Sequence, residues 1–324
     1  MTLRIGVLGA SRIAEQAIVG PAGDLGHRLV AVAARDPRRA EIFAEKYGVE
    51  RVVGSYDELL ADPEVDVVYN PLANSLHGPW SIKSVKAGKP VLSEKPYASN
   101  AAEARRVAAA SEAAGVPVVE AFHYLYHPVF QRVLELIGSG ELGTLRHVEV
   151  RMLMPAPADS DPRWSLAMAG GVLMDLGCYG LHVMRTIGAA VGATPEIVSA
   201  RAEERDPGVD AIFEAQVGIG EATGLSVNNM LADDFHFSVK VVGSLGEVLA
   251  PNFIKPQADD RVVVSTSSGE KVEHLGTRTS YTYQLEAFAA HVLDGAPLPT
   301  DNADAVANMA LIDEAYIAAG MSPR

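Results

Sequence analysis

Residues 4–14 read RIGVLGASRIA, an apolar run that passes into a turn of small residues. Short apolar runs bounded by turn signals are typical of buried parallel strands. A dinucleotide fingerprint has three glycine positions after such a strand. Here Gly9 fills the first, whereas Ser11 and Ala14 occupy the other two. Glycine permits a tight turn and a close backbone approach to a pyrophosphate at the next helix N-terminus. Only one fingerprint glycine is present, so the prediction of a nucleotide-binding strand and turn rests mainly on the apolar strand that precedes the turn and the helix expected after it.

Up to about residue 120, apolar runs alternate with helix-like stretches rich in Ala, Glu and Arg. Asp36 before Pro37 is an N-cap signal, and Gly48 closes that helix. Asn100 with Glu103 forms a capping box for a later helix. This alternation predicts an α/β domain with a doubly wound parallel sheet over residues 1–121. We expect its strands at residues 3–8, 29–34, 65–69, 90–93 and 117–120.

Beyond about residue 120 the pattern changes to β-rich stretches between helices. The short turns contain Gly, Asp or Ser, which favours hairpins and a mostly antiparallel open sheet. We therefore expect a second, α+β domain over residues 122–324 that binds substrate and self-associates. Alternating apolar positions along 225–231 leave one sheet face for a partner, so a homodimer or homotetramer is expected. The expected strands are 146–154, 197–202, 211–217, 225–231, 236–242 and 261–266, and the expected helices are 127–137, 171–187, 283–293 and 301–319.

The composition limits the classes of function. The 324 residues are 48% hydrophobic and 21% charged, which is ordinary for a globular enzyme. The net charge of −14, without any Lys/Arg cluster, argues against a nucleic-acid partner. Cys178 is the only cysteine, so no intrachain disulfide forms. We find no leader and no uninterrupted apolar run of about 18 residues, so we expect a soluble, cytoplasmic protein without membrane contact.

The choice between the two nicotinamide nucleotides depends on the end of the second strand, about twenty residues beyond the fingerprint. An acidic residue there would bind the ribose 2′-hydroxyl, but the chain reads Ala33-Ala34-Arg35-Asp36. A guanidinium binds a 2′-phosphate in a bidentate manner, which favours NADP over NAD. Arg35 and Arg39 are the expected ligands, and Arg12 adds to this phosphate or to the pyrophosphate. The alternative makes Asp36 the ribose ligand, although its place before Pro37 suits an N-cap better.

Two further loops are expected at the carboxyl edge of the same sheet, where ligands bind in open α/β folds. One follows the third strand and reads Tyr69-Asn70-Pro71-Leu72-Ala73-Asn74-Ser75-Leu76-His77. Asn74 and His77 are suited to contact the nicotinamide ribose or the diphosphate. Taken alone, His77 would be a helix-start residue satisfied by backbone groups. The other loop follows the fourth strand as Ser93-Glu94-Lys95-Pro96, which brings the ammonium group of Lys95 to this edge.

A polar stripe interrupts the apolar helix expected at 171–187. Asp175, Tyr179 and His182 are spaced by four and three residues, so they share one helix face. Buried polar groups are costly unless they are hydrogen-bonded or functional. The alternatives are a catalytic set and a self-satisfied network at a domain interface. No His/Cys/carboxylate spacing indicates a structural zinc site, and no metal is expected. No Gly-x-Ser-x-Gly elbow supports a hydrolase.

With these residues assembled, the chain resembles the family of glucose-fructose oxidoreductase and inositol dehydrogenase. The resemblance rests on four motifs in both expected domains: the Gly9/Ser11/Ile13-Ala14 turn, Pro71…Asn74…His77, Glu94-Lys95-Pro96 and Gly171…Asp175…Tyr179. It implies a Rossmann domain followed by a domain with a mostly antiparallel open sheet. It also implies oxidation or reduction of a sugar, cyclitol or related carbinol with a nicotinamide cofactor, usually by an oligomer. The family often has histidine where this chain has Tyr179, so the chain looks similar to the dihydrodiol and aldose dehydrogenase branch, in which NADP is frequent.

The resemblance also implies roles for individual residues. Lys95, Asp175 and Tyr179 take the catalytic positions. His123 departs from the family pattern, which has an apolar or amide residue near the nicotinamide, so it is expected to contribute to the substrate pocket. The implied substrate contacts are His123, Trp164, Asp175 and His182. The implied cofactor contacts are Gly9, Ser11, Arg12, Ile13, Arg35, Arg39, Pro71, Leu72, Asn74, His77, Glu94, Lys95 and Pro96.

The expected chemistry is reversible hydride transfer between nicotinamide C4 and a carbinol or carbonyl carbon. Tyr179 would take or give the hydroxyl proton. A free phenol, with a pKa of ~10, is a poor base at neutral pH, and Lys95 would favour its phenolate. Asp175 would orient the substrate hydroxyl and keep Lys95 charged; Lys95 as the direct proton donor is the alternative. A catalytically silent NADP-binding regulator, of which this family includes the yeast galactose repressor, is the rival function, and turnover of any polyol would exclude it.

Overall fold

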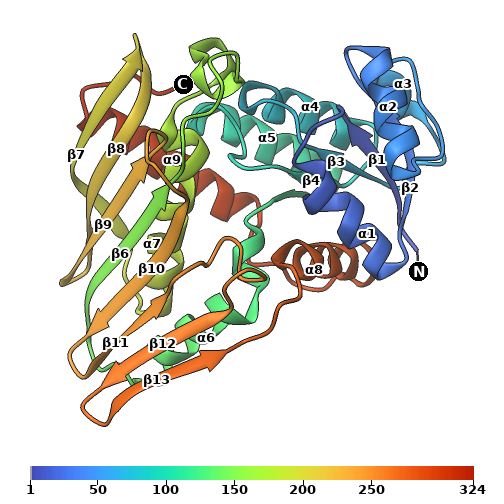
Figure 1. The fold of residues 1–324 in the computed structure, drawn as a ribbon. Helices are drawn as coiled ribbons and strands as arrows, with labels where there is room; N and C mark the ends of the chain where they lie inside the picture. The colour runs from blue at the N-terminus through green and yellow to red at the C-terminus, as the bar shows by residue number, and fades with distance from the viewer. Residues whose placement is uncertain (1) are drawn as a thin grey trace. The chain divides into compact units, whose positions relative to one another are not determined.

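The computed structural model describes residues 2–324, which form two compact units. The first comprises the chain up to Phe122 together with Tyr281–Ala307. The second comprises His123–Ser280 and Asn308–Arg324. Figure 1 labels most of the helices and strands of both units. Residues 281–307 thus belong to the first unit, although the sequence analysis included them in the expected second domain. The functional division into nucleotide-binding and substrate-binding domains stays a prediction.

The first unit is built on a five-stranded sheet in which every neighbouring pair is parallel. The strands are the five predicted ones, and their ends lie within two residues of the expected positions. Their order across the sheet is β2 (Arg28–Ala33), β1 (Arg4–Leu8), β3 (Val67–Asn70), β4 (Val91–Ser93) and β5 (Val118–Glu120). The doubly wound prediction is confirmed, because helices cover both faces of this sheet.

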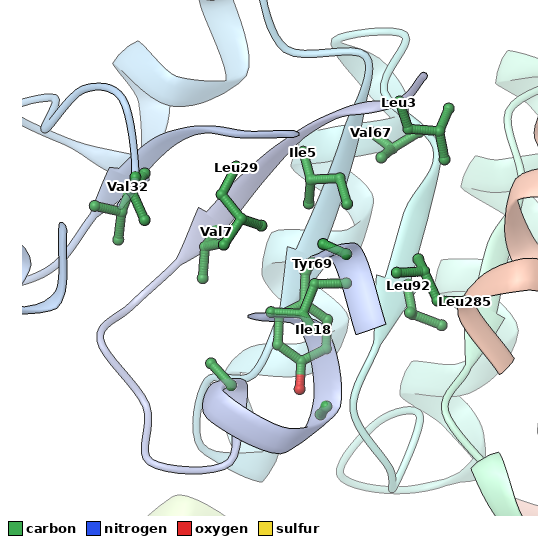
Figure 2. Close-up of a cluster of buried hydrophobic side chains, with 14 of the residues drawn as sticks. Leu3, Ile5, Val7, Ile18, Leu29, Val32, Val67, Tyr69, Leu92 and Leu285 are labelled. Atoms are coloured by element: carbon green, nitrogen blue, oxygen red, sulfur yellow. The ribbon is translucent and has the colours of Figure 1, made fainter. Parts of the chain in front are cut away.

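Apolar side chains bury the two faces in separate clusters. On one face, Ile5 and Val7 of β1 belong to a cluster that also contains Ile18 and Leu285, and Figure 2 shows Leu285 beside Leu92. The helices of that face are η1 (Glu15–Val19), α1 (Gly20–Leu25), α2 (Pro37–Tyr47) and α8 (Ser280–Asp294). The other face packs against α3 (Tyr56–Ala61) and α4 (Asn74–Lys86), and α5 (Ala101–Ala114) lies beside α4. Burial on both faces explains why these strands read as continuous apolar runs.

The helix caps of this unit form as predicted. The side chain of Asp36 accepts a hydrogen bond from the backbone N–H of Arg38 at 3.0 Å, so Asp36 is the N-cap of α2. The side chain of Asn100 accepts the N–H of Glu103 at 2.9 Å and caps α5 in the same way. Helix α2 ends at Gly48, which has a left-handed φ of 68°. These helix ends could be predicted from the sequence because each cap depends on residues that are close together in the chain.

The second unit contains an eight-stranded mixed sheet. In this sheet only the pair β6 (Leu145–Leu153) and β9 (Ala222–Asn229) is parallel, and the other pairs are antiparallel. The remaining strands are β7 (Pro195–Asp206), β8 (Val209–Ile219), β10 (His236–Gly243), β11 (Gly246–Ala250), β12 (Arg261–Thr266) and β13 (Gly269–His274), in the order β13-β12-β11-β10-β6-β9-β8-β7. The mostly antiparallel sheet is confirmed. The sequence analysis missed β11, which is short, and β13, whose side chains are almost all exposed.

Helices pack on this sheet and carry the polar stripe. The predicted helix 171–187 is a π-helical turn, η5 (Leu173–Gly177), that continues as α7 (Cys178–Ala190). Helix α7 lies close to β9 because Gly180 leaves room for it: a Cβ at Gly180 would lie 2.3 Å from Ser226 Oγ. The other helical segments are η2 (His123–Tyr126), α6 (Pro128–Gly138), η3 (Pro162–Trp164), η4 (Leu166–Met168) and α9 (Asn302–Ala318), of which α9 enters this unit at Asn308.

The helical segment Leu166–Ala190, with a mean hydropathy of 1.3, is long and apolar enough to span a membrane by length and composition alone. However, 83% of the scored window is buried inside the structure. Asp175 and Arg185 interrupt the stretch, which is why the sequence shows no continuous apolar run of that length. The segment is the core helix of its unit, because its apolar residues pack on the sheet.

Candidate active site

The predicted phosphate-binding turn lies at the carboxyl end of β1. Gly9 has a φ of 87°, a left-handed conformation that residues with a side chain rarely adopt. Its N–H donates to the carbonyl of Ala33 at 2.6 Å, and a Cβ there would approach Leu72 Cδ2 to 3.0 Å. Ser11 and the exposed Arg12 follow, and the carbonyl of Ile13 accepts the N–H of Ala17, so a helical segment starts directly after the turn. This arrangement fits a pyrophosphate, since the turn admits only a residue without a side chain.

Arginines gather at the end of β2, next to this turn. Arg35, Arg38 and Arg39 are all exposed. One of them is fixed, because Arg39 Nη2 donates to the carbonyl of Ala10 at 3.0 Å. Asp36 is engaged as the N-cap of α2, which agrees with the reading preferred from the sequence. The charge beside the turn is thus cationic, as a 2′-phosphate requires.

His77 lies buried between the two loops that follow β3 and β4. Its Nε2 is 2.8 Å from the carbonyl of Leu72, and its Nδ1 is 2.7 Å from the carbonyl of Pro96. Burial lowers the pKa of His77 to about 4, although the two carbonyls act in the opposite direction. Asn70, at the end of β3, donates to the carbonyl of His77 at 3.2 Å. Both ring nitrogens face backbone groups, so His77 connects the two loops. This agrees with the alternative that His77 is a helix-start residue satisfied by backbone groups.

The loop Glu94-Lys95-Pro96 is held on both sides of the lysine. Glu94 is buried and accepts a hydrogen bond from Tyr69 Oη at 2.8 Å. On the other side, the N–H of Tyr97 donates to Glu120 Oε1 at 2.7 Å. Lys95 itself is partly exposed. Neighbouring anchors in buried positions therefore fix the backbone that carries its ammonium group.

In the second unit, the buried carboxylate Asp175 pairs with an arginine that the sequence analysis did not identify. Arg163 Nε lies 2.6 Å from Asp175 Oδ2, and Arg163 Nη1 lies 3.2 Å from Asp161 Oδ2. The charge of Asp175, with that of Asp161, raises the pKa of Arg163 above its usual range. The neighbouring Trp164 is buried, and its indole N–H donates to the carbonyl of Pro157 at 3.2 Å.

Tyr179 lies one helical turn after Asp175 and joins a buried chain of polar groups. Its hydroxyl is 3.2 Å from His123 Nε2, and His123 Nδ1 is 2.8 Å from Ser280 Oγ. One turn further along α7, His182 Nδ1 is 2.6 Å from the hydroxyl of Tyr124. Each member of the predicted stripe therefore has a hydrogen-bonding or ionic partner, which offsets the cost of its burial.

The start of this helix is anchored by a second buried carboxylate, Asp210 on β8. It accepts the N–H of Leu173 at 2.7 Å and the hydroxyl of Tyr316 at 3.1 Å, and it forms an ion pair with Arg324. Burial raises the pKa of Asp210, while Arg324 opposes that shift. The helix that carries Asp175 and Tyr179 therefore begins from a fixed point.

Arg163, Tyr124 and Ser280 were not predicted, and the distance along the chain explains this. Ser280 is 157 residues from His123, and Tyr124 is 58 residues from His182. No periodicity connects such positions. Only Arg163 left a local signal, since it directly precedes Trp164, a residue already expected at the substrate.

The first unit has a parallel sheet with a glycine turn and a cationic strand end, and the second unit carries a buried set of Tyr, His and carboxylate side chains. These features define a dinucleotide-dependent oxidoreductase. Comparison with known proteins agrees. A family model described as an oxidoreductase family with an NAD-binding Rossmann fold matches residues 3–122, and the GFO/IDH/MocA C-terminal domain model matches residues 130–249. The chain belongs to this GFO/IDH/MocA family, as its motifs indicated. It is therefore a nicotinamide-nucleotide-dependent oxidoreductase that acts by hydride transfer.

Individual relatives resemble the chain over most of its length. A D-xylose 1-dehydrogenase (NADP(+)) 2 of Haloferax volcanii is 30% identical over 317 residues, covering 97% of this chain and 96% of that protein. The trans-1,2-dihydrobenzene-1,2-diol dehydrogenase of Mus musculus is 36% identical over 215 residues, covering 65% and 63%. The structure of KijD10, a 3-ketoreductase from Actinomadura kijaniata in complex with NADP and TDP-benzene, gives a TM-score of 0.88 at 27% identity, covering 97% and 96%.

Proposed function

We propose that the protein is an NADP-preferring dehydrogenase or reductase that interconverts a carbinol and a carbonyl on a sugar, cyclitol or dihydrodiol. The observation that carries the proposal is the buried Tyr179 hydroxyl, hydrogen-bonded to His123 one helical turn from the Asp175–Arg163 pair. The relatives support the substrate class, because one is named for D-xylose and another for a dihydrodiol. A family member with only a regulatory role would not need this hydrogen-bonded arrangement of Tyr179 and Asp175.

The residues around the glycine turn suit the cofactor. Gly9, Ser11, Arg12 and Ile13 would hold the pyrophosphate at the start of the helical segment. Arg35 and Arg39 would bind the 2′-phosphate, and the contact from Arg39 to the carbonyl of Ala10 supports this. When bound, the nicotinamide supplies the hydride acceptor or donor. The further expected contacts are Pro71, Leu72, Asn74, Glu94, Lys95 and Pro96, with His77 supporting the loops through its ring nitrogens.

Proton transfer is assigned to Tyr179. In the oxidation direction, the substrate hydroxyl proton passes to the Tyr179 phenolate, while the carbon-bound hydrogen leaves with its electron pair. In the reduction direction, the Tyr179 hydroxyl returns that proton to the forming alkoxide. Lys95 would favour the phenolate by its charge, and Asp175, held by Arg163, would orient the substrate hydroxyl. Lys95 as the direct proton donor is the alternative assignment. His123, Trp164 and His182 would line the substrate pocket.

The test is a screen of sugars, cyclitols and trans-dihydrodiols against NADP and NAD, read at the nicotinamide absorbance. The proposal expects turnover with at least one class and a higher kcat/KM with NADP. Tight binding of NADP by calorimetry, without turnover of any of these substrates, would instead identify a silent regulator.

Assembly and location complete the proposal: a cytoplasmic homodimer or homotetramer that pairs through the eight-stranded sheet. On β9, Ser226 and Asn228 face the helices and are buried, whereas Leu225 and Val227 point to the other face and are only partly buried. Partly exposed apolar positions on the side away from the helices would be covered by a second copy.

A further inference from the structure

Tyr179, His123 and Ser280 form a continuous hydrogen-bonded chain inside the second unit. The chain runs from the Tyr179 hydroxyl to His123 Nε2 at 3.2 Å, and from His123 Nδ1 to Ser280 Oγ at 2.8 Å. The three residues come from α7, η2 and the first position of α8. They are 5%, 0% and 0% exposed, respectively, so bulk water does not replace these contacts.

The serine determines which nitrogen of His123 carries the proton. Within residues 2–324, the Ser280 hydroxyl makes a hydrogen bond to His123 alone. Buried donors are costly to leave unpaired, whereas an oxygen lone pair is less so. Ser280 therefore donates its O–H to Nδ1, because this hydroxyl has no other acceptor in the described residues, whereas Tyr179 has further interactions. A neutral imidazole that accepts at Nδ1 carries its proton on Nε2.

The resulting tautomer aims a donor at the catalytic hydroxyl. We propose that His123, fixed by Ser280 as the Nε2–H tautomer, donates a hydrogen bond to Tyr179 Oη and stabilises its phenolate, and so is a positioning residue for proton transfer. The inference rests on the proposed acid–base role of Tyr179. It adds a task in proton transfer to the expected place of His123 at the substrate pocket. A donor to the charged form of a group favours that form.

Other ionisable groups also surround Tyr179 within its unit. Asp175 lies one turn earlier on the same helical segment and is paired with Arg163. The Tyr124 ring is 6.0 Å from the Tyr179 ring between centroids, and the Tyr124 hydroxyl is bonded to His182. The proposed role of Lys95 adds a further charge. A pH profile alone therefore does not isolate His123, and the test needs variants that change only its hydrogen bonds.

The tautomer is directly observable by NMR of protein labelled with ¹⁵N-histidine, because the ring nitrogen shifts separate N–H from unprotonated nitrogen. The His123 signals are assigned by their loss in His123→Gln. The proposal expects a protonated Nε2 and an unprotonated Nδ1 at neutral pH. It also expects Ser280→Ala to shift the signals towards a tautomer mixture. A protonated Nδ1 in the unsubstituted protein would overturn the proposal independently of any activity.

Kinetics in the oxidation direction measure the consequence. His123→Leu removes the donor and should lower kcat about 10- to 100-fold at neutral pH, the size expected for a hydrogen bond to a charged group. The midpoint of the basic limb should rise by about one to two pH units, so that much of the rate returns at high pH. His123→Gln keeps an N–H donor without a titrating ring and should recover most of the loss.

Control variants separate the alternatives. His127→Gln removes a second buried histidine, whose Nε2 lies 3.0 Å from the carbonyl of Arg278, and should leave the midpoint unchanged. A His123→Leu enzyme with a raised KM but an unchanged kcat and midpoint would make His123 a substrate contact alone and refute the inference. Tyr179→Phe distinguishes a failure of the proposed function from a failure of the inference about His123. If it abolishes turnover while His123→Leu leaves kcat and the midpoint of the basic limb unchanged, the proposed function stands and this inference fails. If Tyr179→Phe turns over normally, the acid–base assignment itself fails.

Discussion

Arg163 Nε lies 2.6 Å from Asp175 Oδ2, and Asp175 is 7% exposed. A carboxylate so buried needs a partner, and the guanidinium supplies both a charge and a directed N–H. The pair holds the Asp175 carboxylate in a fixed orientation one helical turn from Tyr179. Arg163 is thereby linked to the proposed substrate-orienting residue, although no motif singled it out.

Removal of Arg163 should affect both stability and catalysis. We expect Arg163→Gln to lower the free energy of unfolding by about 1–2 kcal/mol, below the usual loss for a fully buried pair because the arginine is partly exposed. It should reduce kcat/KM about 10-fold or more, since Asp175 loses its orientation. Arg163→Lys keeps the charge and should recover part of the stability. Denaturant titration and steady-state kinetics measure both effects, and unchanged kinetics in Arg163→Gln would argue against the orienting role of Asp175.

Cofactor preference should depend on Arg35. Arg35→Ala should weaken NADP binding by about 1.5–3 kcal/mol, the range for a hydrogen bond to a charged group, while NAD binding changes little. Arg38→Ala removes a neighbouring exposed cation and is the matched control. Calorimetric titration with each nucleotide gives the comparison. Equal losses for NADP and NAD would remove the 2′-phosphate assignment.

His77 should make the protein less stable in mild acid. Its pKa is lowered to about 4 in the fold, against 6.5 as its ordinary value. Below about pH 6.5 the unfolded chain therefore binds a proton that the folded chain does not. The contribution of His77 is complete above that pH and is lost as the pH falls towards 4, by up to about 3 kcal/mol. His77→Gln should show a correspondingly flatter pH dependence in urea titrations, with His147→Gln as the control. A steeper dependence in His77→Gln would mean that the two carbonyls hold the ring charged.

Self-association should use the open face of the eight-stranded sheet. Leu225→Glu and Val227→Glu place charges at partly buried positions on that face and should dissociate the assembly without unfolding it. Ala113→Glu, which places the same charge at an exposed position on α5 of the first unit, is the control. Light scattering measures the outcome. A species of 34.3 kDa alone for the unsubstituted protein at micromolar concentration would contradict the proposal.

Local signals in the sequence were enough for the parallel sheet. Each of its strands is a short buried run, and Asp36, Gly48 and Asn100 mark helix ends through contacts within a few residues. The second sheet was only partly readable. Strand β13 has exposed side chains along nearly its whole length, so no apolar alternation marks it. Burial of alternate or consecutive side chains leaves an apolar pattern in the sequence, and the exposed edge strand β13 lacks that pattern.

The same distinction between local and distant signals applies to the residues of the site. Asp175, Tyr179 and His182 were found because helical spacing places them on one face. Their partners Arg163, His123 and Tyr124 reach that face from other elements, and only the fold reveals which atoms they meet. The fold also shows that the His77 ring lies between two backbone carbonyls, while the cofactor contact expected of His77 from its motif stays a prediction.

The acid–base role of Tyr179 is tested most directly by Tyr179→Phe, which keeps the ring and removes the hydroxyl. We expect kcat to fall by about 10²–10⁴, the usual contribution of general acid–base catalysis, with NADP affinity nearly unchanged. Lys95→Met should cost at least as much, and the double variant should be far from additive if the two residues serve one proton transfer. The limb of the pH profile that reports the base should also disappear. A Tyr179→Phe enzyme with normal turnover and a normal pH profile would contradict the account and move the proton role to Lys95 or His182.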